Sequence, residues 1–352
     1  MNNRLFQADS AGMASSPDRK KEFGDLSKQS RWLEFSSDVI KRFSSNVSAY
    51  PDRKPVLRDD IRCPPGVLNS MAGCAYAFLA NERRIIAKEL KHKPLTHQFG
   101  WFNKPGFRAS DDFLLIRDLP GQKDAIFELI GKLAAGMQGK DAVDYGCYEI
   151  SRSQRADQSM VYTIKMTNPL VSPEVKTGKK ISEQGEYAEP ELTITFEDYG
   201  DQDPRTRIQV EHPMTPFDFM YEGKTEYMED KFREMDDHFK ACLGWTSDKS
   251  VEDFLVNAGA LAHILARMQP VGRGNSAIVE WMIRGLAAAV GIELGAFNYE
   301  TKIGWDFKAF LTPVRADYAN WFAKNAFVSA RYQAEFKVEN ESGIETKLNK
   351  SK

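Results

Sequence analysis

The chain has 352 residues, of which 42% are hydrophobic and 28% charged, a balance that indicates a globular protein and excludes a largely disordered one. This length allows one large domain or two ordinary ones around a substantial core. The formal net charge of −2 gives no overall positive field that would favour nucleic acid as the partner. No run of 18 uninterrupted apolar residues occurs, so we expect no transmembrane segment.

The first 30 residues are polar, rich in Ser and Asn, and poor in large apolar groups. They lack the apolar stretch of a Sec signal peptide. Because such a segment buries too little surface to offset the entropy of ordering it, we predict that 1–30 is disordered. It is either an ordinary tail or an export signal for a specialised secretion machine. Asn2 stands where N-myristoylation requires Gly, so we expect no N-myristoylation.

The region 31–137 has a helical pattern. Apolar residues recur at spacings of three and four along 32–43 and 67–90, which predicts two helices. A third helix is predicted over 123–137, weakened by its two glycines. The aromatic, turn-rich stretch 99–107 lies between the second and third helices.

The region 138–211 changes to period-two alternation with many β-branched residues, which predicts a small antiparallel β-meander. Its predicted strands lie within 144–151, 159–167, 190–197 and 205–211. The pattern is helical again over 212–336, and 337–352 has the composition of a flexible tail. The sequence therefore predicts an α+β fold, mostly helical, with an inserted meander.

Two helices joined by a short loop are predicted within 247–297. Ser250 and Asp253 have the spacing of a capping box, which starts the first helix near Val251. Pro270 ends this helix. Either Asn275 or Ser276 is a suitable N-cap for the second helix.

The loop between these helices places Arg273 between Gly272 and Gly274. The backbone N–H groups and the dipole at a helix start favour an anion, and glycines allow a phosphate to approach the backbone closely. A guanidinium group suits bidentate contact with phosphate. These residues predict an anion site, although taken alone they also fit a tight turn with a surface arginine.

The stretch MQPVGRGNSA (268–277) has the layout of the Fic-family loop HPFxxGNGR. Gln269 stands at the position of the catalytic histidine, and Ala277 at that of the final arginine. Glutamine has no usable pKa, so it cannot act as the general base. The longer stretch RGNSAIVEWMIRGLAAAVGIELGAF more closely resembles the AvrB family of bacterial type III effectors, avirulence proteins with a degenerate Fido (Fic-like) fold that also lack this histidine.

This resemblance covers about residues 250–310 and implies a Fido-like helical core. It places Arg273 at the family's diphosphate-contacting arginine and Asp306, in GWDFKAFL, at an aspartate beside the ligand. The shorter segments NPLVSP and VEHP are similar to parts of the family's cleft and place Asn168 and His212 there. The implied catalytic residues are Asp306 and His212, and the implied substrate- and nucleotide-binding residues are Arg273, Gly272, Gly274, Asn275, Ser276 and Asn168.

The resemblance also implies a function. A secreted effector of this type is translocated into the host-cell cytoplasm and acts there on a protein that regulates immunity. The implied reaction transfers a deoxyhexose such as rhamnose from a nucleotide diphosphate sugar, the co-substrate, to a Thr or Ser, with no tightly bound cofactor. Two alternatives stay open, namely an AMPylation-like nucleotidyl transfer and a non-catalytic nucleotide-binding adaptor for a host protein.

Metal and redox chemistry have little support in the sequence. The chain contains no HExxH motif and no CxxC pair, so we expect no metal site. Reduced thiols are expected at the four cysteines, which are Cys63, Cys74, Cys147 and Cys242. His263, in the first of the two paired helices, is expected to be a hydrogen-bonded histidine at the edge of the core.

Overall fold

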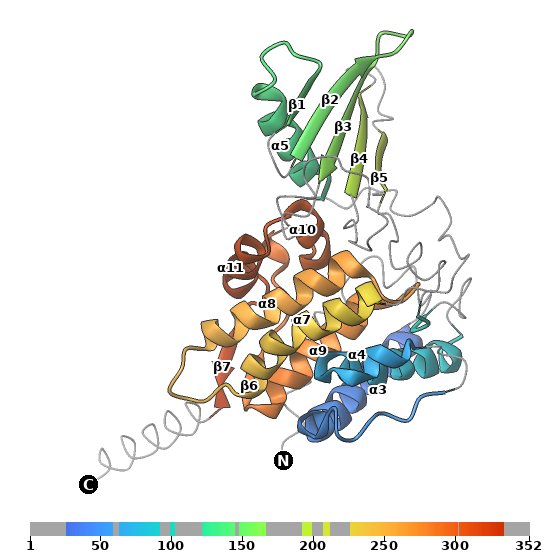
Figure 1. The fold of residues 1–352 in the computed structure, drawn as a ribbon, viewed down its shortest axis with the longest axis vertical. Helices are drawn as coiled ribbons and strands as arrows, with labels where there is room; N and C mark the ends of the chain where they lie inside the picture. Colours follow the sequence, from blue (N-terminus) through green and yellow to red (C-terminus); the bar gives the residue numbers. More distant parts are fainter. Residues whose placement is uncertain are drawn as a thin grey trace.

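The computed structural model of the chain contains a helical lobe and a smaller lobe built on a β-sheet (Figure 1). The α+β class predicted from the sequence is confirmed. Among the described helices, none is both long and apolar enough to cross a membrane. The structure describes residues 26–58, 63–91, 99–102, 122–144, 148–166, 192–198, 207–211, 226–301 and 303–333.

The helical lobe contains most of the hydrophobic core. Its helices are α3 (Leu26–Asn46), α4 (Met71–Glu89), α7 (Glu226–Leu243), α8 (Val251–Met268), α9 (Asn275–Ala289), α10 (Trp305–Leu311) and α11 (Arg315–Asn325). Short elements accompany them, namely the 3-10 turns η1 (Val47–Ala49), η2 (Pro65–Asn69) and η5 (Tyr299–Thr301) and the antiparallel pair of β6 (Ile292–Leu294) and β7 (Ala330–Tyr332).

Two boundaries in this lobe differ from the predicted ones. Helix α3 begins at Leu26, inside the segment 1–30 predicted to be disordered, and residues 1–25 of that segment lie outside the described part. Once Trp32 and the following turns are packed, extending the helix toward the N-terminus costs little free energy, because each residue that is ordered adds one backbone hydrogen bond. Helix α4 begins only after Ser70, whose hydroxyl accepts a hydrogen bond from the Gly73 N–H.

The sheet lobe confirms the predicted meander. All five strands pair antiparallel with their sequence neighbours, in the order β1-β2-β3-β4-β5. The helix α5 (Gln122–Ala135) accompanies this sheet (Figure 1). The strands are β1 (Ala142–Asp144), β2 (Tyr148–Gln154), β3 (Met160–Met166), β4 (Leu192–Asp198) and β5 (Arg207–Glu211).

Helix α10 belongs to both cores and lies where the lobes meet (Figure 1). Its Trp305 is buried in the helical core. Phe307 and Phe310 are buried in the second core, together with Ile150 and Ile164 of the sheet. The position of α10 therefore depends on the packing of both lobes.

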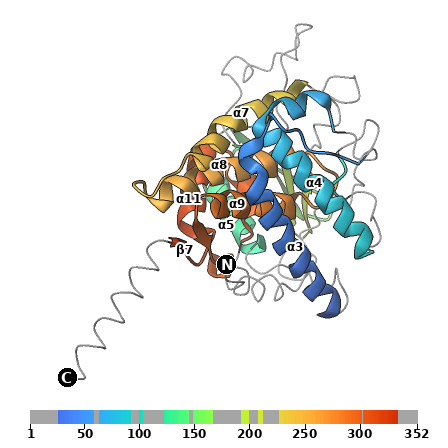
Figure 2. The same cartoon turned by 90° about the horizontal axis from the view of Figure 1, so that it is seen from below.

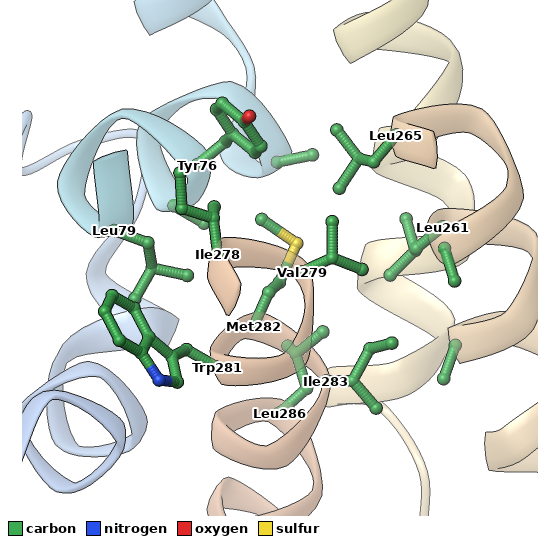
Figure 3. Packing of buried hydrophobic residues seen from close by; sticks show 14 of the residues in the cluster. Tyr76, Leu79, Leu261, Leu265, Ile278, Val279, Trp281, Met282, Ile283 and Leu286 are labelled. Carbon is green, nitrogen blue, oxygen red and sulfur yellow. The ribbon is translucent and has the colours of Figure 1, made fainter. Parts of the chain in front are cut away.

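Helix α9 is the central helix of the helical lobe and lies between the α3–α4 pair and α8 (Figure 2). Its apolar side chains face Tyr76 and Leu79 of α4 on one side and Leu261 and Leu265 of α8 on the other (Figure 3). Burying one such Leu, Ile or Met side chain contributes about 1.5–3 kcal/mol. This packing fixes both ends of α9, and the loop before it, relative to the neighbouring helices.

Candidate functional site

The loop between α8 and α9 is only a few residues long and takes two left-handed residues. Helix α8 starts with the predicted capping box of Ser250 and Asp253 and ends at Met268. Gln269 follows with φ 42°, and Gly274 precedes α9 with φ 85°. Position 274 requires glycine for two reasons. Its φ is positive, and a Cβ atom would lie 2.8 Å from Nε of Arg83.

This loop is held by the aromatic segment 99–102, which comes from far earlier in the chain. The Gly100 N–H donates to the Arg273 carbonyl at 3.0 Å, and the Gly272 N–H donates to the Trp101 carbonyl at 3.0 Å. The first bond orients the backbone of Arg273. The second commits the N–H of Gly272 to the protein, so that this group does not face a ligand as the sequence led us to expect.

Asn275 turns inward. Its side-chain Nδ2 donates to the Leu265 carbonyl at 2.8 Å, and its Oδ1 accepts from the Tyr76 hydroxyl at 2.7 Å. Burial raises the pKa of the Tyr76 hydroxyl, which therefore keeps its proton and donates. Because the Asn275 amide is engaged in this way, the N-cap of α9 is Gly274 and not the predicted Asn275 or Ser276.

The N-terminus of α9 is positive. Its first turn carries no acidic residue, and the capping glycine provides no side-chain oxygen. The side chain of Arg273 is exposed beside it. On the inner side, the Arg83 side chain packs against Gly274, with its guanidinium group 4.2 Å from the centre of the Phe99 ring and 4.7 Å from that of Trp32. Two guanidinium groups and one carboxylate, that of Asp306, thus adjoin the positive end of the helix dipole, and the net positive charge favours an anion.

Ser276 and Asp306 meet at this end of α9, although 30 positions separate them. The Ser276 hydroxyl donates to Oδ2 of Asp306 at 2.6 Å. The other carboxylate oxygen, Oδ1, accepts the Phe307 N–H at 2.8 Å. Ser276 is exposed and Asp306 half-buried, so this pair lies at the surface beside the helix end.

Helix α10, which carries Asp306, is anchored by polar groups of the neighbouring helices. The Tyr318 hydroxyl donates to the Trp305 carbonyl at 2.9 Å, and Nη1 of Arg267 donates to the Phe310 carbonyl at 3.3 Å.

His263 anchors the segment after α10, where its Nε2 donates to the Thr312 carbonyl at 2.8 Å. Desolvation, together with the nearby positive charge of Arg267, lowers the pKa of His263 to about 3. His263 is thus a neutral anchor, fully buried in the core and not at its edge.

The structure brings most of the predicted site residues together around one helix end. Arg273, Gly274 and Ser276 lie at the start of α9, with Asp306 beside them, while Asn275 faces the interior. The predicted cleft residues Asn168 and His212 lie outside the described residues.

Arg83 and the segment 99–102 were missed by the sequence reasoning. Arg83 belongs to a helix far from the loop in sequence, and no local pattern connects the two. The density of aromatic residues in FGWF was the one available signal.

No metal centre is found in the described part, where no group of three or more His, Cys, Asp or Glu side chains is placed to hold an ion. The three cysteines that the structure describes, Cys63, Cys74 and Cys242, are free, as predicted.

Neither protein-family models nor curated protein sequences match this chain. The resemblance to the AvrB family over 250–310 therefore stays a prediction. What supports a functional proposal is the geometry around the α9 N-terminus.

Proposed function

We propose that the N-terminus of α9 binds the diphosphate of a nucleotide and that the protein transfers the group which this nucleotide carries. The single observation behind this proposal is the exposed Arg273 beside a helix end that has neither a side-chain cap nor an acidic residue in its first turn. A diphosphate there accepts hydrogen bonds from the first backbone N–H groups of the helix, which have no intrahelical acceptor. Arg273 adds a charge-assisted, bidentate contact.

The reaction class follows from the charge that develops during transfer. When a glycosyl group leaves a nucleotide sugar, negative charge grows on the departing diphosphate. Preorganised donors at that position stabilise the transition state more than the ground state and so accelerate the step. Asp306, held beside Ser276, is the ionisable group available to take a proton from an acceptor hydroxyl.

The finer proposal adopts the AvrB resemblance. In it the donor is a nucleotide diphosphate deoxyhexose, the acceptor is a Thr or Ser of a host immune regulator, and the chain is a secreted bacterial effector. Nucleotidyl transfer and a non-catalytic adaptor role are the competing functions. They are separated by the mass added to a target, which is one deoxyhexose, one nucleotide or nothing.

Calorimetric titration with UDP and ADP tests the binding step. Because hydrogen bonds to charged groups contribute about 1.5–3 kcal/mol, Arg273→Ala should weaken binding by roughly 10- to 100-fold. Arg273→Lys should restore only part of the affinity, since it keeps the charge and loses the bidentate geometry.

Arg331→Ala is the matched control, because Arg331 is likewise exposed but belongs to β7, which pairs with the strand after the opposite end of α9. It should bind both nucleotides as the unmodified protein does. Equal affinities of the Arg273→Ala and unmodified proteins would contradict the assignment of the site.

A further inference from the structure

The Ser276–Asp306 pair has the arrangement of an activated nucleophile. Such sites hold a hydroxyl within hydrogen-bond reach of a base, while a third group orients the base. Here the Ser276 hydroxyl donates to Oδ2 of Asp306 at 2.6 Å, and the Phe307 N–H holds Oδ1 at 2.8 Å. The carboxylate is therefore fixed from one side and directed at the serine from the other.

A second Ser–Asp pair in the molecule shows what the same contact looks like when it serves only structure. Ser250 donates to Oδ2 of Asp253 at 2.8 Å, but its oxygen also accepts the Asp253 N–H at 3.1 Å. The lone pairs of Ser250 are thus used in capping α8. Ser276 is the second residue of α9, whose N-cap is Gly274, so it does not occupy the capping position that Ser250 has in α8.

The position of Ser276 would place its hydroxyl beside a nucleotide diphosphate sugar bound at the start of α9. A diphosphate bound by the backbone N–H groups at the start of α9 would lie beside Ser276, the second residue of this helix, and so would the sugar that it carries. The serine side chain is exposed at this point. Its hydroxyl already donates to a carboxylate that can act as its base.

We propose that Ser276 is an acceptor of the chain's own transfer reaction, with Asp306 as its general base; this inference rests on the proposed transferase function. The Ser276 oxygen attacks the anomeric carbon of the nucleotide sugar, and the C–O bond to the diphosphate breaks. The hydroxyl proton passes to the Asp306 carboxylate, and the nucleoside diphosphate leaves with the electron pair. The product is a serine O-glycoside at the mouth of the site.

Glycosylation of Ser276 would slow further transfer by the same protein molecule. A sugar on Ser276 removes the hydrogen that the serine donates to Asp306 and fills the space beside Arg273. The modified protein should therefore bind a nucleoside diphosphate more weakly than the unmodified one.

The test incubates the full-length protein with UDP-rhamnose or dTDP-rhamnose, without any other acceptor. Intact mass and peptide mapping follow the protein, and chromatography follows the free nucleoside diphosphate. We expect the unmodified protein to gain one deoxyhexose on the peptide that contains Ser276. Ser276→Ala should gain none, and Asp306→Asn should react about 10²- to 10⁴-fold more slowly, the usual cost of removing a general base.

Ser250→Ala is the matched control and should be labelled like the unmodified protein. Release of nucleoside diphosphate without any gain in mass would overturn this inference while leaving the proposed function in place. A label that persists in Ser276→Ala would overturn it as well. Absence of both nucleotide binding and release would overturn the proposed function and the inference with it.

Discussion

The N-termini of α8 and α9 contain the same chemical groups, combined in different ways. Each has a serine that donates to an aspartate, at 2.8 Å in α8 and 2.6 Å in α9. In α8 the two residues are three positions apart, and the Ser250 N–H also donates to Asp253 at 3.1 Å. In α9 the aspartate comes from another helix, and the N-cap is a glycine.

The difference separates a terminus that stabilises its own helix from one that is available to a ligand. The capping box of α8 satisfies backbone N–H groups with oxygens of the same segment, and it needs nothing from the rest of the fold. The α9 terminus is assembled from α4, the segment 99–102 and α10, and it leaves its first N–H groups without a side-chain cap. Its geometry therefore depends on tertiary packing.

Acid should destabilise the folded protein through His263, which anchors the segment after α10. The folded protein holds the pKa of His263 at about 3, below the ordinary 6.5 that applies in the unfolded chain. As the pH falls below 6.5, His263 becomes protonated in the unfolded chain but stays neutral in the folded protein. The free energy of unfolding should therefore fall by about 1.4 kcal/mol per pH unit.

His263→Gln keeps a donor for the Thr312 carbonyl but does not titrate. Urea denaturation between pH 6.5 and about 4.5 should therefore show a shallower loss of stability in this variant. Other acidic groups titrate equally in both proteins and cancel in the comparison. Parallel pH slopes would mean that His263 takes no part in acid unfolding.

Gly274→Ala should destabilise the protein and weaken nucleotide binding. A side chain at φ 85° costs about 1–2 kcal/mol, and the new methyl group would press on the Arg83 side chain. Gly131→Ala on α5 is the opposite control, because a Cβ there meets open space in a helix. It should stabilise by about 0.5–1 kcal/mol. Urea unfolding measures both, and equal effects would show that the backbone of Gly274 is not strained.

Ser250→Ala and Ser276→Ala should separate stability from function. Loss of the α8 cap should cost about 1 kcal/mol and leave the calorimetric affinity for UDP unchanged. Ser276→Ala should leave the unfolding free energy within about 0.5 kcal/mol, as is usual for exposed positions. A large loss of stability in Ser276→Ala would place it with the capping serine.

Gln269→Ala should have the smallest effect. Its amide cannot take a proton, so any transferase rate should stay within about tenfold, compared with the 10²- to 10⁴-fold expected for loss of a general base. Initial rates of nucleoside diphosphate release measure this, with Asp306→Asn as the comparison. A decrease as large as that of Asp306→Asn would point to a Fic-type role for this position.

The sequence by itself determined the features that depend on neighbours within a few positions. The spacing of Ser250 and Asp253 predicted the capping box, and Pro270 marked the end of α8. Gly291 follows the C-cap of α9 with φ 79°, a conformation for which glycine is the usual residue. The alternation over 144–211 predicted four of the five strands of the meander. Periodicity and capping are local, so the order of residues records them directly.

Only the tertiary structure decided how the site is built. By residue type, Asn275 and Ser276 are equally suitable N-caps. The side chain of Asn275 is held inward, however, by hydrogen bonds to the Tyr76 hydroxyl and the Leu265 carbonyl. Tyr76 is 199 positions away from Asn275, and Asp306 is 30 positions away from Ser276. No local pattern encodes such partners, because they meet only when buried apolar side chains fix the relative positions of α4, α8, α9 and α10.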